Sequence, residues 1–127
     1  MKNFRSKRFY AGKYSQSKWW TGGFESVDVG ASCRLIPFWE TNKIVNDRIP
    51  IVIDPGPAFG LGDHPTTIMA LELLEMSLKD LKDHYNSLSV LDVGCGVGVL
   101  AIASLLLGAS NAVAIDIDPV AVNIAKR

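Results

Sequence analysis

The stretch VLDVGCGVG, from Val90 to Gly98, decides the fold of this chain. A β-branched apolar run leads into Asp92, and glycines follow at alternate positions, beginning with Gly94 and Gly96. Glycine tolerates the dihedral angles of a tight turn and lets the backbone come close to a ligand. The stretch therefore predicts an apolar strand over Ser89–Val93, as in a parallel sheet covered on both faces. This strand ends in a glycine turn that leads into a helix.

A second strand and an acidic residue complete this pattern. A helix is predicted over residues 97–107, closed by Gly108, and the apolar run Asn111–Ile115 predicts the next strand, with Asp116 at its tip. Asp116 follows Gly94 by 22 residues, near the spacing of about 20 that is typical of nucleoside-binding units. The order of strand, glycine turn, helix, strand and acid predicts an α/β, Rossmann-like sheet whose acid accepts hydrogen bonds from ribose hydroxyls.

The spacing of the glycines bears on the kind of nucleoside. The third glycine comes one residue earlier than in the dinucleotide pattern G-x-G-x-x-G, and Asp92 stands two residues before the first. A carboxylate beside the turn disfavours a pyrophosphate and suits a cation. The pattern therefore favours S-adenosylmethionine over NAD or a ligand-free domain. Close packing of helix against strand would explain Gly98 in addition to ligand approach. Asp118 is interpreted as a helix cap, and Cys95 as a small side chain that fills space.

The segment before the turn predicts further elements. Residues 33–36 and 49–54 are predicted to be short strands, with 42–47 as a polar connection or a hairpin, and they belong to a short antiparallel β segment that precedes the Rossmann-like sheet. Pro50 indicates an edge strand or a strand start. Residues 54–65 hold three glycines and three prolines, which predicts a loop.

A helix is predicted to begin at Pro65 and to end near residues 83–87, with Asp63 or His64 as its cap. Apolar residues recur at helical spacing along one face, and three more widen that face. The first set is Ile68, Leu71, Leu74, Leu78 and Leu81, and the second is Met69, Leu73 and Met76.

Composition excludes several classes of protein. A chain of 127 residues with 48% hydrophobic residues indicates one domain with a packed core. The longest apolar stretch, 97–108, is too short to span a membrane, and no signal-peptide core stands at the N-terminus. Cys33 and Cys95 lack the spacing of metal ligands or of a disulfide framework. We therefore expect no metal site and a cytoplasmic protein.

The net charge of zero hides an asymmetry. Residues 1–20 carry six basic residues and no acid, so the rest of the chain has a net charge of −6. Such a basic, aromatic-containing segment is typical of a solvated tail or linker, and also of a segment that contacts RNA. We expect an irregular basic tail or linker over residues 1–22 and a partial domain of the S-adenosylmethionine-dependent type over residues 23–127.

The loop makes the pattern more specific. DPGPAFGLGDHPTT, from Asp54 to Thr67, resembles the signature of the bacterial PrmA-type methyltransferases, which modify a large-subunit ribosomal protein. The upstream RLIPFWE and the downstream VLDVGCGVGVLAIA and AIDIDPVAV are similar to the same family, in the same order. The resemblance covers about residues 24–127.

This resemblance implies methyl transfer from S-adenosylmethionine to a protein amine, with a lysine of a ribosomal protein as the expected acceptor. It implies that Phe59 packs on the cofactor and that Thr67 bonds its methionine portion. Gly94 and Gly96 would give the close backbone approach, and Asp116 would bind the ribose. His64 could act as a base or as a helix cap, and no catalytic residue is assigned.

The chain also departs from the family. Leu61 stands where the family usually has threonine, the separate N-terminal domain is absent, and the chain stops before the asparagine motif near the transferred methyl group. Three hypotheses follow: the front part of such an enzyme, a non-catalytic nucleoside-binding module, or a methyltransferase for another acceptor. An open edge of two parallel strands also invites self-association.

Overall fold

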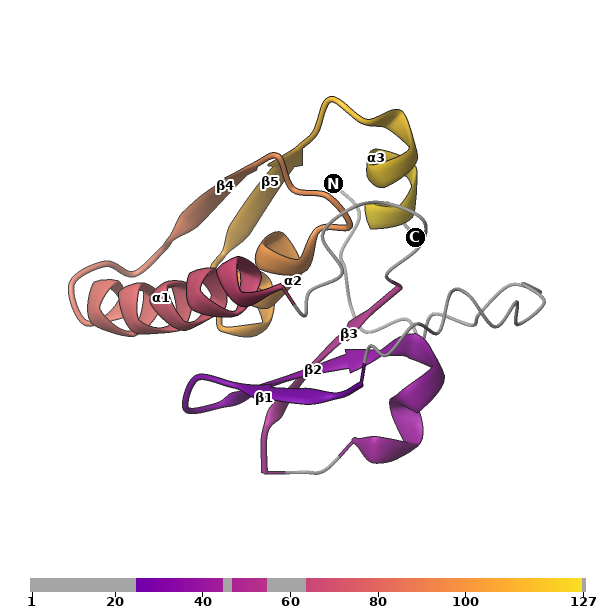
Figure 1. The fold of residues 1–127 in the computed structure, drawn as a ribbon. Coiled ribbons are helices and arrows are strands. Elements are labelled where there is room, and N and C mark those ends of the chain that lie inside the picture. Colours follow the sequence, from indigo (N-terminus) through magenta and orange to yellow (C-terminus); the bar gives the residue numbers. More distant parts are fainter. Residues whose placement is uncertain (1–24, 45–46, 55–63, 127) are drawn as a thin grey trace.

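The computed structural model describes residues 25–44, 47–54 and 64–126, which form two small β-sheets and the helices that pack on them (Figure 1). Residues 55–63 of the loop predicted over 54–65, which include Phe59 and Leu61, and the predicted tail at 1–22 lie outside the described residues. The elements follow in the order β1 (Val27–Val29), β2 (Cys33–Pro37), the 3₁₀ helix η1 (Phe38–Lys43), β3 (Ile49–Ile53), α1 (Pro65–Lys82), β4 (Ser89–Val93), α2 (Val99–Leu106), β5 (Asn111–Ile115) and α3 (Pro119–Ala125).

The second sheet has the predicted architecture. Strands β4 and β5 pair in parallel, with Ser89 opposite Asn111 and Val93 opposite Ile115. Helix α2 forms the crossover between them, as a parallel pair requires. The bounds of both strands are those that the sequence predicts. Helix α2 begins two residues later than predicted, because Gly98 takes a left-handed conformation, with φ of 84°, and becomes its N-cap.

The first sheet differs from expectation in its connections. Its strand order is β1-β2-β3, with β1 antiparallel and β3 parallel to β2. The prediction that residues 42–47 form a hairpin is therefore wrong, and the alternative of a polar connection holds for the described part. The antiparallel segment is the β1–β2 pair, and β1, at three residues, is too short to give a clear period-2 pattern. Pro50 lies on the edge strand β3, one residue from its start, as predicted.

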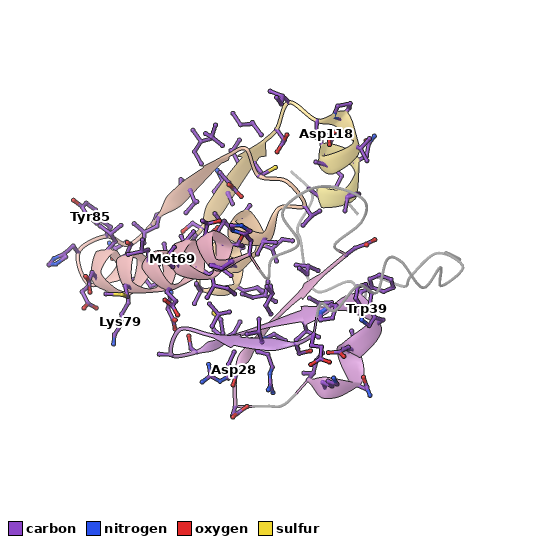
Figure 2. The ribbon with its side chains drawn as sticks, viewed as in Figure 1. Asp28, Trp39, Met69, Lys79, Tyr85 and Asp118 are labelled. Atoms are coloured by element: carbon purple, nitrogen blue, oxygen red, sulfur yellow. The ribbon has the colours of Figure 1, made fainter. Side chains whose placement is uncertain are left out.

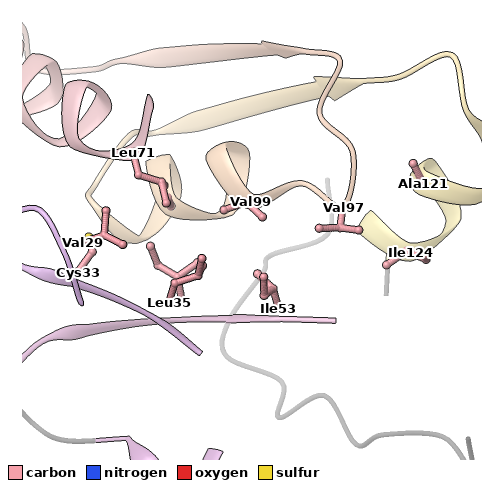
Figure 3. Close-up of a cluster of buried hydrophobic side chains, with 11 residues drawn as sticks. Val29, Cys33, Leu35, Ile53, Leu71, Val97, Val99, Ala121 and Ile124 are labelled. Carbon is pink, nitrogen blue, oxygen red and sulfur yellow. The ribbon is translucent and has the colours of Figure 1, made fainter. Parts of the chain in front are cut away.

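The hydrophobic core lies between the first sheet and the helices (Figure 3). Val29, Cys33, Leu35 and Ile53 line the helix-facing side of the sheet in this cluster. The other side of the cluster comes from α1, from α2 with the turn before it, and from α3, through Leu71, Val97, Val99, Ala103, Ala121 and Ile124. Helix α2 also contacts β4 and β5, so this helix lies between the two sheets and fixes their spacing (Figure 1).

Helix α1 begins where the sequence predicts. Pro65 is its first residue, and the His64 Nδ1 accepts a hydrogen bond from the Thr66 N–H at 3.3 Å as the N-cap. The helix ends at Lys82, one residue before the predicted region of its end.

The apolar face of α1 is narrower than predicted. Leu71 and Leu78 are buried, but Met69, Leu73 and Met76 are 54%, 63% and 64% exposed (Figure 2). The prediction that these three residues widen the apolar face is therefore wrong for the described residues. The reason is that α1 contacts α2 and β1, which cover only one side of the helix.

The second sheet is covered on one face among the described residues. Asp92 is buried on the side of α2, while the neighbouring Leu91 and Val93 point the other way and are 64% and 70% exposed. The apolar character of β4 predicts a strand covered on both faces, and only one covering layer lies within the described residues.

Three further features bear on function classes. Cys33 and Cys95 are free and buried. Among the described residues, no cluster of potential ligands could hold a metal ion. None of the described helices has the length and apolarity needed to cross a membrane.

Candidate functional site

The candidate site is the glycine turn between β4 and α2, at the carboxyl ends of the two parallel strands. Gly94, Gly96 and Gly98 all have positive φ values, of 75°, 54° and 84°. Residues with a Cβ rarely take this conformation, so the alternating glycines are explained by the backbone path itself. The N–H groups of Gly94 and Cys95 both donate to the Ile115 carbonyl, at 2.8 and 3.0 Å, and this ties the turn to β5.

Asp116 joins the glycine turn to the start of α3. One carboxylate oxygen accepts the Gly96 N–H at 2.8 Å, and the other accepts the Asp118 N–H at 2.8 Å. These two backbone hydrogen bonds, the one from Asp118 first, hold the pKa of Asp116 below its ordinary value. The side chain is therefore an anion at neutral pH. It is only partly buried, so its remaining lone pairs can accept hydrogen from a ligand hydroxyl.

Asp92 lies on the other side of the turn and faces inward. Its carboxylate accepts the Ala101 N–H at 3.1 Å and is only 8% exposed. Burial raises the pKa of Asp92, the hydrogen bond from Ala101 opposes this effect, and the negative charge of Asp116 adds to it. The sequence placed Asp92 near the ligand but missed this contact. The alternation along β4, which turns Val90 and Asp92 toward α2, is the signal that could have found it.

The space around the glycines differs from one position to the next. Among the described residues, no atom lies within 4 Å of a Cβ built on Gly94, so these residues leave the approach to Gly94 open. A Cβ on Gly98 would lie 3.3 Å from the Cβ of Ala125 in α3. Close packing thus accounts for Gly98, and here the partner is a helix and not the strand. Gly94 has no such packing reason, and its open side is where a ligand can approach the backbone.

Two neighbouring side chains have local roles. Burial raises the pKa of the Cys95 thiol, and the charges of Asp92 and Asp116 raise it further. A thiol of this kind stays protonated and is a poor nucleophile, in agreement with its interpretation as a filler. Asp118 accepts the Val120 N–H at 2.8 Å and caps α3, as the sequence predicts (Figure 2).

The loop-side residues lie at the start of α1. Thr67 is half-buried in the first turn, and its N–H donates to the His64 carbonyl at 2.9 Å. Among the described residues, no hydrogen bond joins Thr67 to the glycine turn. The His64 Nδ1 also lies 2.7 Å from the Thr66 hydroxyl. Because Nδ1 accepts the Thr66 N–H, the neutral ring carries its proton on Nε2. The capping role of His64 is therefore confirmed, and Phe59 lies outside the described residues.

Together the turn offers an open backbone edge, an ionised carboxylate at the adjacent strand tip and a net negative charge. This set suits a ligand that carries hydroxyl groups and no negative charge. Phosphate groups would meet the repulsion of Asp92 and Asp116, whereas a cationic nucleoside would not.

Comparison with known proteins identifies the family. The model of the family described as ribosomal protein L11 methyltransferase (PrmA) matches residues 7–127. The chain belongs to this family. A protein from Thermosynechococcus vestitus named ribosomal protein L11 methyltransferase is 43% identical over 108 residues, covering 85% of this chain and 36% of its own length. One of the same name from Citrifermentans bemidjiense is 47% identical over 105 residues, covering 83% and 34%.

A solved structure agrees with the fold. The crystal structure of a ribosomal protein L11 methylase from Lactobacillus delbrueckii subsp. bulgaricus matches with a TM-score of 0.60 and 31% identity, over 81% of this chain and 48% of that one. This confirms the predicted fold class, an incomplete Rossmann-like methyltransferase sheet preceded by a short antiparallel β segment, here β1 and β2, and one helix. The chain spans about a third of the length of the curated relatives it matches.

Proposed function

We propose that this chain forms the cofactor-binding part of an S-adenosylmethionine-dependent methyltransferase that modifies a ribosomal protein. The observation that carries the proposal is the pairing of open space at Gly94 with the ionised carboxylate of Asp116 on the same turn. The family supports the reaction class, because the relatives are named for methyl transfer to ribosomal protein L11. The proposed acceptor is an amine of that protein, with lysine as the expected residue.

The residues of the site fit this cofactor. Asp116 would accept the two ribose hydroxyls with the lone pairs that Gly96 and Asp118 leave free. Gly94 and Gly96 would allow the close approach of the nucleoside to the backbone. Thr67 would bond the methionine portion, and Phe59 would pack on the cofactor. The carboxylates of Asp92 and Asp116 suit the positive charge of the sulfonium and amino groups.

The cofactor supplies an activated methyl group, bonded to a sulfonium. The role left to the protein is alignment and exclusion of water, and alignment of this kind can contribute roughly 7–11 kcal/mol to lowering a barrier. The described residues hold the nucleoside end. His64 is engaged as a helix cap through Nδ1, which does not favour it as the base for the acceptor amine.

The setting of this function is also a proposal. Ribosomal proteins are made and modified in the cytoplasm, and we propose that compartment for this chain. Residues 23–127 would then be one part of a catalytic domain. The basic residues at positions 2–18 would suit contact with ribosomal RNA beside the protein substrate.

Asp116→Ala in the protein that carries these residues tests the cofactor assignment. We expect binding of S-adenosylmethionine to weaken by more than about 1 kcal/mol, or roughly fivefold, because a charge-assisted acceptor is removed. Isothermal titration calorimetry measures this. Asp118→Asn is the matched control, since asparagine keeps the cap on Val120 and removes a nearby charge. Equal affinity of Asp116→Ala and the unsubstituted protein would rule out Asp116 as the ribose ligand.

A transfer assay separates the three hypotheses about activity. Protein, S-adenosylmethionine with a radiolabelled methyl group and large-subunit ribosomal proteins are incubated together, and the label is followed. Label in ribosomal protein L11 supports the proposed function. Binding without transfer to any acceptor indicates a non-catalytic module, and label in another molecule indicates a different acceptor.

A further inference from the structure

The N-terminus of α2 lacks a capping side chain of its own. The first N–H groups of any α-helix have no partner within the helix. In α1 and α3 the residue before the helix supplies one, through the side chains of His64 and Asp118. The corresponding residue of α2 is Gly98, which has no side chain and makes no such bond. The glycine is required there by its φ of 84° and by the contact with Ala125.

The missing acceptor comes from the preceding strand. The Asp92 Oδ2 accepts the N–H of Ala101, the third residue of α2, at 3.1 Å across a separation of nine residues. Asp92 is 8% exposed, and it is the one buried residue with a carboxylate among those described. A buried carboxylate is costly unless it is hydrogen-bonded. Asp92 lies on β4 and faces the N-terminus of α2, and the positive end of the helix dipole there offsets that cost.

This bond closes the glycine turn into a ring. Residues 93–100 lie between its two ends, so the strand before the turn and the helix after it are held at a fixed spacing. Asp116 meanwhile holds Gly96, near the middle of the same segment, at 2.8 Å. The turn is thus fixed at its centre from β5 and at its ends by Asp92. Without the second bond, α2 could shift along its axis and change the path of Gly94.

We propose that Asp92 is a positioning residue that acts as a remote N-cap of α2 and so holds the glycine turn in its ligand-ready conformation. The inference rests on the proposed function for its consequence, which is tighter cofactor binding. Its structural part, a braced turn, is independent of any ligand.

Three variants test the inference in the protein that carries these residues. Asp92→Ala removes the acceptor, and Asp92→Asn keeps an oxygen that can accept the Ala101 N–H without the charge. Ser104→Ala is the matched control. The buried Ser104 hydroxyl donates to the Ala101 carbonyl at 2.7 Å, so this variant also loses a buried hydrogen bond at Ala101 but leaves the brace intact.

The first readout is amide hydrogen exchange without ligand. We expect exchange over residues 94–101 to become at least tenfold faster in Asp92→Ala, to change less than threefold in Asp92→Asn, and to stay near the unsubstituted rate in Ser104→Ala. Unchanged exchange in Asp92→Ala, or an equal increase in Ser104→Ala, would overturn the inference. This readout decides the matter even if the protein binds no S-adenosylmethionine, a result that would contradict only the proposed function.

The second readout is cofactor affinity. Asp92→Ala should raise the dissociation constant for S-adenosylmethionine at least fivefold and clearly more than Asp92→Asn, which loses the charge but keeps the hydrogen bond to Ala101, while Ser104→Ala stays within twofold. Urea unfolding of the three variants shows whether Asp92→Ala and Ser104→Ala lose comparable stability. Weak binding in both would mean that general loss of stability, and not the brace, controls affinity, and would overturn the functional part of the inference.

Discussion

Two glycine turns of this molecule differ in what occupies the space beside them. At Gly30, between β1 and β2, a Cβ would overlap with the Glu75 carboxylate of α1. That carboxylate accepts the Ala31 N–H at 2.9 Å and the Ser32 hydroxyl. At Gly94 a Cβ would meet no atom of the described part of the chain within 4 Å. Both glycines have positive φ, of 58° and 75°.

The comparison separates a structural turn from a binding turn. At Gly30 the protein fills the space with its own carboxylate, and the result is a tie between the first sheet and α1. At Gly94 the described residues leave the space open, although Asp116 and Asp92 hold the surrounding backbone through hydrogen bonds. A positive φ alone therefore does not indicate a ligand site. Space beside the glycine that the described residues leave unfilled is the feature that indicates one.

The largest expected effect is on stability, at the filled turn. Gly30→Ala should lower the free energy of unfolding by about 2 kcal/mol, from strain at positive φ of about 1 kcal/mol and loss of the Glu75 hydrogen bonds of about 1 kcal/mol. Urea unfolding measures it. In a Glu75→Ala background the same substitution should cost only the strain, about 1 kcal/mol, because no carboxylate remains to be displaced. Equal losses of unfolding free energy in both backgrounds would show that the Glu75 carboxylate does not set the cost of a side chain at Gly30.

The open turn should respond in the opposite way. Gly94→Ala should cost only about 1 kcal/mol of unfolding free energy, from strain alone, since the new methyl group meets no atom of the residues that the structure describes. It should nevertheless weaken S-adenosylmethionine binding at least tenfold, or about 1.4 kcal/mol, because the methyl group occupies the ligand side. Calorimetry on Gly94→Ala and on Gly30→Ala, which should bind normally, sharpens the contrast. Normal binding by Gly94→Ala would remove the distinction between the two turns.

The smallest expected effect is a pH dependence of the unfolding free energy that comes from Glu40, beside the first sheet. Glu40 in η1 bonds Lys43 and both the hydroxyl and the N–H of Ser26. These contacts, that of Lys43 first, lower the pKa of Glu40 from 4.5 to about 2. A lowered pKa in the folded state means that its stabilisation is present above pH 4.5 and is lost as the pH falls toward 2.

Urea midpoints between pH 6 and pH 2 measure this loss. Glu40→Gln should show a shallower decline than the unsubstituted protein, because the contacts of the ionised form are already gone. Glu72→Gln, on the exposed side of α1, is the control and should follow the unsubstituted protein. Identical declines for Glu40→Gln and Glu72→Gln would show that Glu40 adds nothing to the first sheet.

The elements that the sequence predicted best depend on local chemistry. The bounds of β4 and β5 follow from two short apolar runs, each closed by a glycine or an acid. Pro65 as the first residue of α1 and the caps His64 and Asp118 follow from contacts between residues that are near in sequence. The hairpin interpretation of 42–47 and the wide apolar face of α1 failed, because each depended on which distant element packs alongside. Period and composition do not carry that information.

For the candidate site the division is similar. Residue types and spacing were enough to predict the glycine turn, its acid and the family. A backbone path with positive φ favours glycine, and an acid at the tip of the next strand is the residue type that accepts hydrogen bonds from ribose hydroxyls. Only the tertiary structure decided that Asp92 bonds the Ala101 N–H, that Gly98 packs on α3 and that Glu75 fills the turn at Gly30. The Glu75 contacts join residues 43 and 44 positions apart. Contacts of that range form only when packing brings the elements together, and no local pattern encodes them.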